Sequence, residues 1–362
     1  MRLLYITTLH YPSPYANRVN VMKMSQSFAE LTDYKIILGD VSTSVEDVFR
    51  EYGIDKSFAV AVLYKKPPVL RPRAFFAALK IKKIIASEPP ETIFYIRDFL
   101  LAYFLSWISG RFRSMCFIEC HALDKFPRAI YKCVLQKARG IISTNNAKKK
   151  YMVESFSIPA EKILVAPNGF DARLFANALD RAQARRELGF GENEKIVLYA
   201  GSMQDWKGVG MLFQLARALP AVKFVVVGAS HDSQKNGVDL IRSQPYWRVP
   251  LFLKAADMLI APYQGSDTRV QLYFSPIKIF EYMASGTPMI VSDIPAIREI
   301  VDDERALFAK MSSHDSFAEK IVWAFEHEAE MEKRAATAKK CSDDFSWEAR
   351  ALRIAEFINK RV

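Results

Sequence analysis

Residues 275–299, SPIKIFEYMASGTPMIVSDIPAIRE, combine a helix start with a lysine and a glutamate that could bind a nucleotide. Ser275 is a favourable helix cap, and Pro276 is favourable as the first helical residue. Lys278 follows in the first turn, where its positive charge opposes the helix dipole. A diphosphate on the free backbone amides would remove that conflict. The alternative is a surface helix with one unfavourably placed lysine, and the residues alone do not separate the two.

The same segment carries a second polar group and a helix end. Glu281 lies three residues after Lys278 and faces the same side, so its carboxylate could accept hydrogen bonds from ribose hydroxyls. Gly286 is expected to end the helix in the left-handed conformation, before a buried strand. If Lys278 binds phosphate, the segment therefore predicts a nucleotide diphosphate site.

A second lysine follows a predicted strand in LYAGSMQDWKGVGML, residues 198–212. The strand ends at Gly201, and Lys207 with Gly208 opens an amphipathic helix. A lysine at such a crossover can reach a phosphate, although a loop lysine without a ligand is the more common arrangement. Gly228 follows another strand and would permit the close approach of a ligand.

In the first half of the chain, FIECHALDK (residues 117–125) ends a predicted strand with a histidine, His121. A single histidine at a strand end is usually structural. Together with the nearby Cys116, Cys120 and Cys133 it fits no common zinc spacing, so we expect no metal site. The four cysteines of the chain fit no disulfide framework either, which indicates a reducing compartment.

Two further polar segments follow strands of the first half. In YPSPYANRVN, residues 11–20, Asn17 is a candidate helix cap and Arg18 could face a phosphate or a sugar. Arg97 and Asp98 follow another strand. Their side chains could line a binding site, or could equally form a salt bridge with each other.

Taken together, these segments resemble family 4 glycosyltransferases, which are retaining enzymes of the GT-B fold. The segment from Ser275 is similar to the branch that reads S-P-x-K-x-x-E-Y-M-A-x-G, and Lys207 matches the lysine of the family's W-K-G segment. Many members carry two glutamates separated by seven residues; Glu281 matches the second, whereas Tyr273 stands at the first. Many also have an arginine where this chain has Ser202.

The resemblance implies a donor diphosphate held by Lys207 and Lys278, with the donor sugar near His121. The implied site residues are His121, Lys207 and Lys278 for catalysis; Gly201, Ser202, Gly228, Phe274, Ser275, Ile277 and Glu281 for donor binding; and Ala16, Asn17, Arg18 and Arg97 in the acceptor or cleft loop. The sequence contains no Asp-x-Asp triplet. We therefore expect no metal and no cofactor, with fixed positive groups stabilising the leaving phosphate.

Short apolar runs alternate with amphipathic stretches along the chain, which indicates parallel β/α folding. The helices predicted in the first half cover residues 19–31, 74–86 and 99–108. The predicted strands cover residues 3–8, 35–38, 59–63, 92–96, 115–119 and 140–143 in the first half, and 196–200, 223–227, 258–261, 288–291 and 306–308 in the second.

At 362 residues the chain exceeds the usual size of a single core, so two domains are expected. The turn formers Pro167, Asn168 and Gly169 mark the junction. We predict an α/β fold with two Rossmann-like, doubly wound parallel sheets facing across a cleft: an acceptor-binding domain over 1–167 and a donor-binding domain over 168–345. The GT-B resemblance implies that residues 346–362, with Ser346 as helix cap, return to the first domain.

The excess of basic over acidic residues is confined to the first half of the chain. Residues 1–170 hold 25 Lys and Arg against 14 Asp and Glu, which accounts for the whole net charge of +11. This excess predicts an anionic partner. Residues 71–83, RPRAFFAALKIKK, could bind an anionic membrane surface through Phe75, Phe76 and Leu79, or could equally form an ordinary Rossmann helix. Basic residues interleaved with aromatics occur nowhere else, so we expect no nucleic-acid partner.

The amino terminus shows no signal peptide, and the longest apolar run, residues 99–108, is about half of the roughly 20 residues that a membrane span needs. We expect a cytoplasmic protein, peripheral at the inner face of the plasma membrane. Its predicted activity is transfer of a sugar from a UDP- or GDP-linked donor to a saccharide acceptor, lipid-linked, in bacterial surface polysaccharide or glycolipid synthesis. A non-catalytic nucleotide-sugar-binding protein and a GT-B epimerase or phosphorylase are the alternatives.

Overall fold

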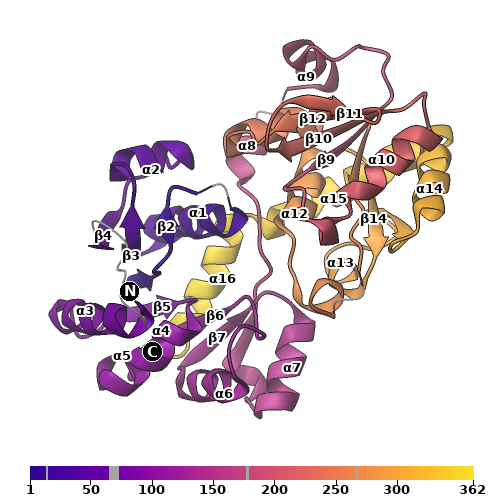
Figure 1. Ribbon diagram of the computed structural model, residues 1–362. Coiled ribbons are helices and arrows are strands. Elements are labelled where there is room, and N and C mark those ends of the chain that lie inside the picture. Colours follow the sequence, from indigo (N-terminus) through magenta and orange to yellow (C-terminus); the bar gives the residue numbers. More distant parts are fainter. Residues whose placement is uncertain (14, 65–72, 177–178, 266–267) are drawn as a thin grey trace. The chain divides into compact units, whose positions relative to one another are not determined.

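The computed structural model describes residues 1–13, 15–64, 73–176, 179–265 and 268–362. The chain forms two compact units (Figure 1). The first domain consists of Met1–Pro167 together with Trp347–Val362, and the second domain consists of Asn168–Ser346. Each domain contains one β-sheet with helices packed against it.

The first domain contains an eight-stranded sheet in which every described strand pair is parallel. The order is β2-β3-β1-β5-β6-β7-β8, with β4 paired to β3. The strands are β1 (Arg2–Ile6), β2 (His10–Tyr11), β3 (Asp33–Val41), β4 (Ala59–Tyr64), β5 (Ile93–Ile96), β6 (Cys116–Cys120), β7 (Gly140–Ser143) and β8 (Ile163–Val165). The order reverses between β1 and β5, and such a switch point is where open parallel sheets bind ligands.

Helices cover both faces of this sheet, so its central strands are buried on both sides and read as continuous apolar runs. All four residues of β5 and of β7 are buried. The helices of this domain are α1 (Ala16–Leu31), α2 (Val45–Glu51), α3 (Arg73–Ser87), α4 (Phe99–Ile108), α5 (Gly110–Ser114), α6 (Arg128–Lys137), α7 (Asn146–Phe156), the short η1 (Ala160–Lys162) and α16 (Trp347–Asn359).

The second domain contains a seven-stranded sheet in the order β11-β12-β10-β9-β13-β14-β15. Its strands are β9 (Ile196–Ala200), β10 (Lys223–Ala229), β11 (Ser233–Lys235), β12 (Val238–Arg242), β13 (Met258–Ala261), β14 (Met289–Asp293) and β15 (Leu307–Lys310). The edge strand β11 runs antiparallel to β12, while the other pairs are parallel. Here the order reverses between β9 and β13.

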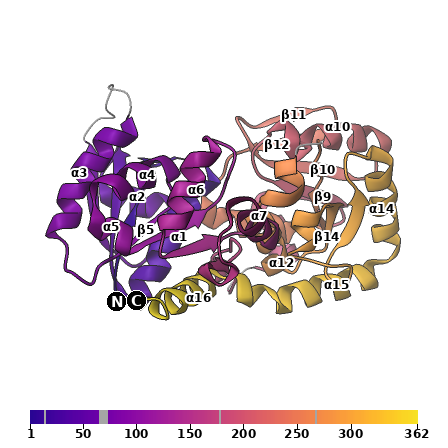
Figure 2. The same ribbon diagram turned by 90° about the horizontal axis from the view of Figure 1, so that it is seen from below.

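Two layers of helices enclose the second sheet, as the two separate apolar clusters on its faces show. Residues of β9 alternate between these clusters: Leu198 packs on one face and Val197 on the other. Helices α10 (Val209–Ala218) and α14 (His314–Glu326) lie side by side in both views (Figures 1 and 2). The other helices are α8 (Ala172–Ala176), α9 (Arg181–Leu188), η2 (Asp205–Lys207), η3 (Tyr246–Arg248), α11 (Val249–Ala255), η4 (Arg269–Tyr273), α12 (Ile277–Ser285), α13 (Pro295–Arg298), α15 (Glu328–Lys340) and η5 (Ser342–Phe345).

The last helix, α16, belongs to the first domain, although the second domain precedes it in the chain. It packs against α1 (Figure 1), and Trp347 and Arg350 are fully buried there. The predicted return of the carboxy-terminal segment is therefore confirmed. Within the described residues, no helix combines the length and the apolar character needed to cross a bilayer.

The predicted strands all exist, with ends that differ by up to three residues, and the predicted doubly wound α/β class is confirmed. The predicted strands do not include β2, β8, β11 and β12. Strand β8 has only three residues, ILV, and the other three strands carry polar residues, as in SQK of β11, so no long run of apolar residues marks any of them. The second sheet is consequently not purely parallel.

Candidate functional site

Lys278, the second residue of α12, reaches the carboxyl end of strand β9 in the second domain. Its Nζ lies 3.6 Å from the centroid of the Tyr199 ring and 5.5 Å from that of Tyr263, which follows β13. The side chain is buried, and its ammonium group has no hydrogen-bond partner among the described residues. Burial, and then the charge of Lys207, hold the pKa of Lys278 well below its usual value. An unpartnered buried amine of this kind is costly without a ligand.

Lys207 lies close to Lys278 and points to the same strand end. Its Nζ donates a hydrogen bond to Ser202 Oγ at 2.6 Å, and burial lowers its pKa. Lys278 Nζ would be only 3.0 Å from a Cβ atom placed on Gly201. The structure therefore brings together Lys207, Lys278, Gly201 and Ser202 at the switch point of the second sheet, where both lysines can contact one anion.

Ser275 does not cap helix α12, contrary to the prediction. The residue before the helix is Pro276, and no side chain caps the helix start. Ser275 Oγ instead accepts a hydrogen bond from the backbone amide of Asn168 at 3.0 Å, and Asn168 Nδ2 donates to the Ser275 carbonyl at 2.7 Å. The serine hydroxyl therefore supplies the acceptor for the backbone amide of Asn168, at the start of the second domain. Gly286 ends the helix with φ of 65°, as predicted.

Glu281 is buried on the same helix as Lys278. Burial raises the pKa of its carboxyl to about 7, although a hydrogen bond from Tyr246 and the charge of Lys278 oppose this effect. Tyr246 comes from η3, 35 residues earlier in the chain, and the sequence analysis did not find it. Because the tyrosine occupies part of the carboxylate, fewer lone pairs of Glu281 are available for ribose hydroxyls than the sequence implied.

Two other predicted donor residues, Phe274 and Ile277, closely precede Lys278 in the chain. Phe274 packs at 4.8 Å from the Tyr263 ring and 5.9 Å from the Trp206 ring, so it belongs to an aromatic cluster beside Lys207. Ile277 is half-buried at the start of α12. Tyr273, at the position of the missing glutamate, ends the short helix η4.

Gly228 lies against the backbone of Gly201. Its φ is 124°, and a Cβ atom there would lie 2.4 Å from the carbonyl oxygen of Gly201. The glycine thus permits the close approach of the neighbouring strand end. It shapes the loop that carries Ser202 and affects the site indirectly.

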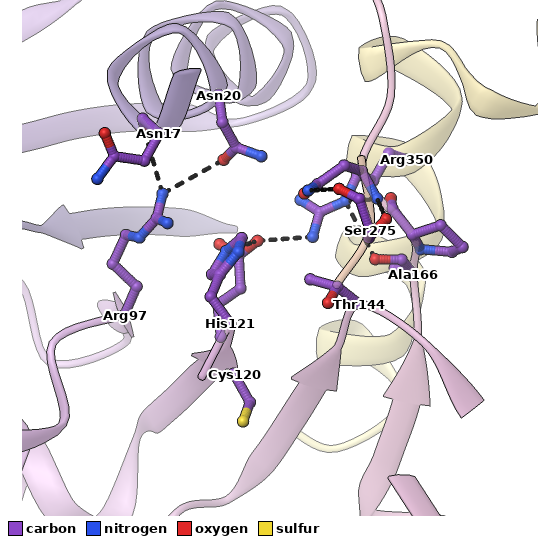
Figure 3. A network of polar contacts seen from close by, with 12 residues as sticks. Asn17, Asn20, Arg97, Cys120, His121, Thr144, Ala166, Ser275 and Arg350 are labelled. Atoms are coloured by element: carbon purple, nitrogen blue, oxygen red, sulfur yellow. Dashed lines mark hydrogen bonds and ion pairs between the residues drawn. The ribbon is translucent and has the colours of Figure 1, made fainter. Parts of the chain in front are cut away.

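His121 follows β6 in the first domain and contacts a buried carboxylate. Its Nε2 lies 2.9 Å from Glu119 Oε1, and Arg350 Nη2 of α16 lies 2.6 Å from the same oxygen (Figure 3). Arg350 also donates to the carbonyl of Pro167 at 2.7 Å. Sequence reasoning missed this network, since Glu119 and Arg350 are 231 residues apart and no local pattern relates them.

Lys148 supports the same strand end from helix α7. Lys148 is the first of three consecutive lysines at 148–150, and its side chain is buried. Its Nζ donates to the carbonyl of His121 at 3.2 Å and to the hydroxyl of Thr144. Nearby, Cys116 and Cys120 are buried in β6. Over the described part of the chain, no three His, Cys, Asp or Glu side chains are grouped so that they could hold a metal ion.

The predicted loop residues of the first domain gather at the start of helix α1. Arg97 Nη1 donates to the carbonyl of Asn17 at 3.3 Å and to Asn20 Oδ1 at 3.4 Å (Figure 3). Arg97 does not pair with Asp98, which instead caps α4 and accepts a hydrogen bond from Thr8.

Asn17 is not the cap of helix α1, contrary to the prediction, because the helix already begins at Ala16. Its side-chain oxygen Oδ1 accepts a hydrogen bond from Arg18 Nη1 at 2.9 Å, so this oxygen is bound to a neighbouring residue of the first turn. Tyr15 precedes the helix and forms no side-chain cap. The backbone amides of this turn are therefore not satisfied by a side-chain cap.

The architecture of this chain, with two parallel α/β domains and a last helix in the first of them, is the GT-B fold. Its structure is similar to that of sucrose-phosphate synthase from Thermosynechococcus elongatus, with a TM-score of 0.76 and 18% identity over 99% of this chain and 98% of that one. It is also similar to Anabaena HepE in complex with UDP and glucose, with a TM-score of 0.77 and 16% identity over 99% of both chains.

The sequence of the second domain was compared with models of known protein families. Residues 180–341, most of the second domain, match the family model described as glycosyl transferases group 1. The matched stretch includes Lys207, Lys278 and Glu281.

Two curated relatives match over longer stretches of the chain. A D-inositol 3-phosphate glycosyltransferase from Corynebacterium aurimucosum is 26% identical over 59% of this chain and 55% of its own length. A lipopolysaccharide 1,2-N-acetylglucosaminetransferase from Salmonella typhimurium is 29% identical over 55% of this chain and 57% of its own. The chain thus spans about half the length of the curated relatives that it matches.

Proposed function

We propose that this protein is a retaining glycosyltransferase that takes a sugar from a nucleotide diphosphate sugar, UDP- or GDP-linked, and transfers it to a saccharide acceptor. The observation that carries the proposal is the buried amino group of Lys278 beside Lys207, which has no hydrogen-bond partner among the described residues. Two lysines at the carboxyl end of a parallel strand, next to a helix start without a side-chain cap, are groups that could bind a diphosphate. The group 1 match over the same residues supports this assignment.

In the proposed reaction the bond between the anomeric carbon and the diphosphate breaks, and negative charge develops on the leaving phosphate. Lys207 and Lys278 stabilise that charge from fixed positions, so no metal is needed in this scheme. The acceptor hydroxyl forms the new bond on the same face of the sugar, and the leaving phosphate takes its proton. Glu281 binds the ribose, and His121 contacts the donor sugar.

The donor is tested by measuring the thermal stability of the protein with UDP, GDP, ADP and dTDP. The correct nucleotide should raise the melting temperature by mass action, whereas the other nucleotides should have smaller effects. The corresponding nucleotide sugar should then support transfer at the same rate with and without EDTA. Stabilisation without any turnover would indicate a binding protein instead, turnover without an acceptor would indicate an epimerase or hydrolase, and full loss of activity in EDTA would contradict the metal-free scheme.

We further propose a lipid-linked acceptor at an anionic membrane, used in surface polysaccharide or glycolipid synthesis at the cytoplasmic face. The candidate surface lies on α3, where the side chains of Phe76 and Leu79 are 38% and 40% exposed. Phe75 packs against Phe104 of α4, with ring centroids 5.5 Å apart, so it contributes to the core instead. Arg71 of the predicted basic cluster lies outside the described residues.

The double substitution Phe76→Ser with Leu79→Ser should reduce flotation of the protein with vesicles that contain anionic lipid, because it removes the exposed apolar area that would enter the interface. Val322→Ser is the matched control, since Val322 is similarly exposed but lies on α14 of the second domain. Equal flotation of the wild-type protein with neutral and anionic vesicles, or no flotation, would exclude this surface.

A further inference from the structure

Trp206 is a partly exposed tryptophan beside the lysine pair of the second domain. It directly precedes Lys207, whose Nζ lies 5.3 Å from the centroid of the indole ring. The indole stacks on the Tyr263 ring, with the centroids 5.8 Å apart, and meets the Phe274 ring edge to face at 5.9 Å. Even so, the residue stays 36% exposed. Part of a large apolar ring is therefore presented to solvent next to a proposed phosphate ligand.

The surrounding backbone holds this indole in one place. The Trp206 carbonyl accepts a hydrogen bond from the backbone amide of Gln264 at 3.0 Å, and the indole Nε1 donates to Gln204 Oε1 at 3.0 Å. A Cβ atom on Gly208 would lie 1.6 Å from the carbonyl oxygen of Pro262, so only a glycine lets this segment approach the end of β13 so closely. A ring that is already fixed loses little conformational entropy when a ligand packs on it.

The order of the strands places the exposed indole on one side of the lysine pair. Strands β12, β10 and β9 follow one another in the sheet (Figure 1), and β13 comes next. Lys278 reaches the end of β9, over the Tyr199 ring. Tyr263, on which Trp206 stacks, follows β13. On the other side, Tyr246 follows β12, and its hydroxyl is in electrostatic contact with the Glu281 carboxyl.

This arrangement gives the proposed donor site two ends. A nucleotide diphosphate sugar has its ribose on one side of the diphosphate and its sugar on the other. With the ribose at Glu281 and the diphosphate at the lysines, as proposed above, the sugar extends towards β13, where Trp206 is exposed. A pyranose ring has a face of C–H groups, and this face packs well on an aromatic ring, whose negative face attracts the weakly positive hydrogens.

We propose that Trp206 is a specificity-determining residue that stacks on the pyranose ring of the donor sugar. This inference rests on the proposed function, because the positions of the ribose and the diphosphate are taken from it. The indole Nε1 is already bound to Gln204 and is the only polar group of the side chain, so the contact with the sugar is apolar. Trp206 thus contributes to binding of the sugar ring and not to binding of the nucleotide.

Trp206→Ala should weaken binding of the nucleotide sugar and leave binding of the nucleotide unchanged. The probes are two matched pairs, UDP with UDP-glucose and GDP with GDP-mannose, and the pair whose nucleotide binds the wild-type protein is used. Isothermal titration calorimetry on the full chain measures both dissociation constants. We expect a rise of roughly 3- to 10-fold for the nucleotide sugar, the size of one aromatic stacking contact, and a change of less than about 2-fold for the nucleotide.

Two further variants separate the stacking contact from a general loss of structure. Trp206→Phe should retain more affinity for the nucleotide sugar than Trp206→Ala, since it keeps an aromatic face. The matched control is Trp323→Ala, which removes another partly buried tryptophan of the second domain, stacked on His327 at the end of α14. This variant should change neither dissociation constant. Unchanged binding of the free nucleotide to Trp206→Ala also shows that the domain has folded.

An equal loss of affinity for the nucleotide and the nucleotide sugar in Trp206→Ala would show that the indole contacts the nucleotide or supports Lys207, and would overturn the proposal. Unchanged binding of both ligands would overturn it as well, while the proposed function would stand. If neither UDP nor GDP binds the wild-type protein, the proposed function fails together with this inference. If the nucleotide sugar binds through Trp206 but no sugar is transferred, only the proposed transfer fails. The two failures are therefore distinguishable.

Discussion

Lys278→Ala should lower the rate of sugar transfer by on the order of 3 kcal/mol, roughly 150-fold, as for the loss of one group that stabilises a developing oxyanion. Lys207→Ala should have an effect of similar size, because both ammonium groups are proposed to act on the same leaving phosphate. Steady-state kinetics with the donor found by the nucleotide screen measure both effects. A near-normal rate in either variant would show that the substituted lysine does not hold the phosphate.

The loss of activity in Lys278→Ala should occur without loss of stability. Lys278 Nζ has no hydrogen-bond partner among the described residues, so removing the buried amine relieves its desolvation without breaking a hydrogen bond and gives up only its contacts with the Tyr199 and Tyr263 rings. We expect an equal or higher melting temperature. The matched control is Lys254→Ala: Lys254 is also partly buried, and its Nζ donates to the Ser285 carbonyl at the other end of α12. This variant should keep its transfer rate, and a loss as large as that of Lys278→Ala would point to a general packing effect.

Arg350→Met should destabilise the protein by about 3–5 kcal/mol, because it leaves Glu119 as a buried charge without its main partner. The double variant Glu119→Gln with Arg350→Met should recover most of this loss, since two neutral side chains of similar size can fill the same space. Urea unfolding followed by circular dichroism measures both free energies. Glu356→Gln is the control for a charge change at an exposed position of α16 and should stay within about 0.5 kcal/mol of the wild-type protein.

If the double variant were as unstable as Arg350→Met, the cause would be lost packing of the arginine stem rather than an unpaired carboxylate. The guanidinium also donates to the carbonyls of Ala166 and Pro167, and these two acceptors lose their partner in both variants. Some part of the destabilisation is therefore expected to remain after the pair is neutralised.

The fold was predictable from sequence because its signals are local. Strand β9, IVLYA, is an uninterrupted apolar run, and the chain after it continues into α10, whose buried residues lie on one face. The two candidate lysines were found for the same reason: each lies next to a strand end or a helix start, and parallel strands bring those positions to one edge of the sheet.

The contacts of the site could not be predicted in the same way. Tyr246 reaches Glu281 from a separate segment, and Arg350 reaches Glu119 across 231 residues, so neither pair leaves a spacing in the sequence. The predictions that Ser275 and Asn17 cap helices were wrong for a different reason. Both have the right chemistry for a helix cap, but another polar group competes for each: the amide of Asn168 for Ser275, and Arg18 for Asn17.

The position of Arg350 also constrains the order in which the domains can form during synthesis. The buried charge of Glu119 is neutralised by a residue that leaves the ribosome only after the whole second domain has been made. The second domain, by contrast, contains all of its own strands in one continuous stretch, 168–346. The later segment can therefore complete its core first, and the amino-terminal half must wait, partly assembled, for the final helix.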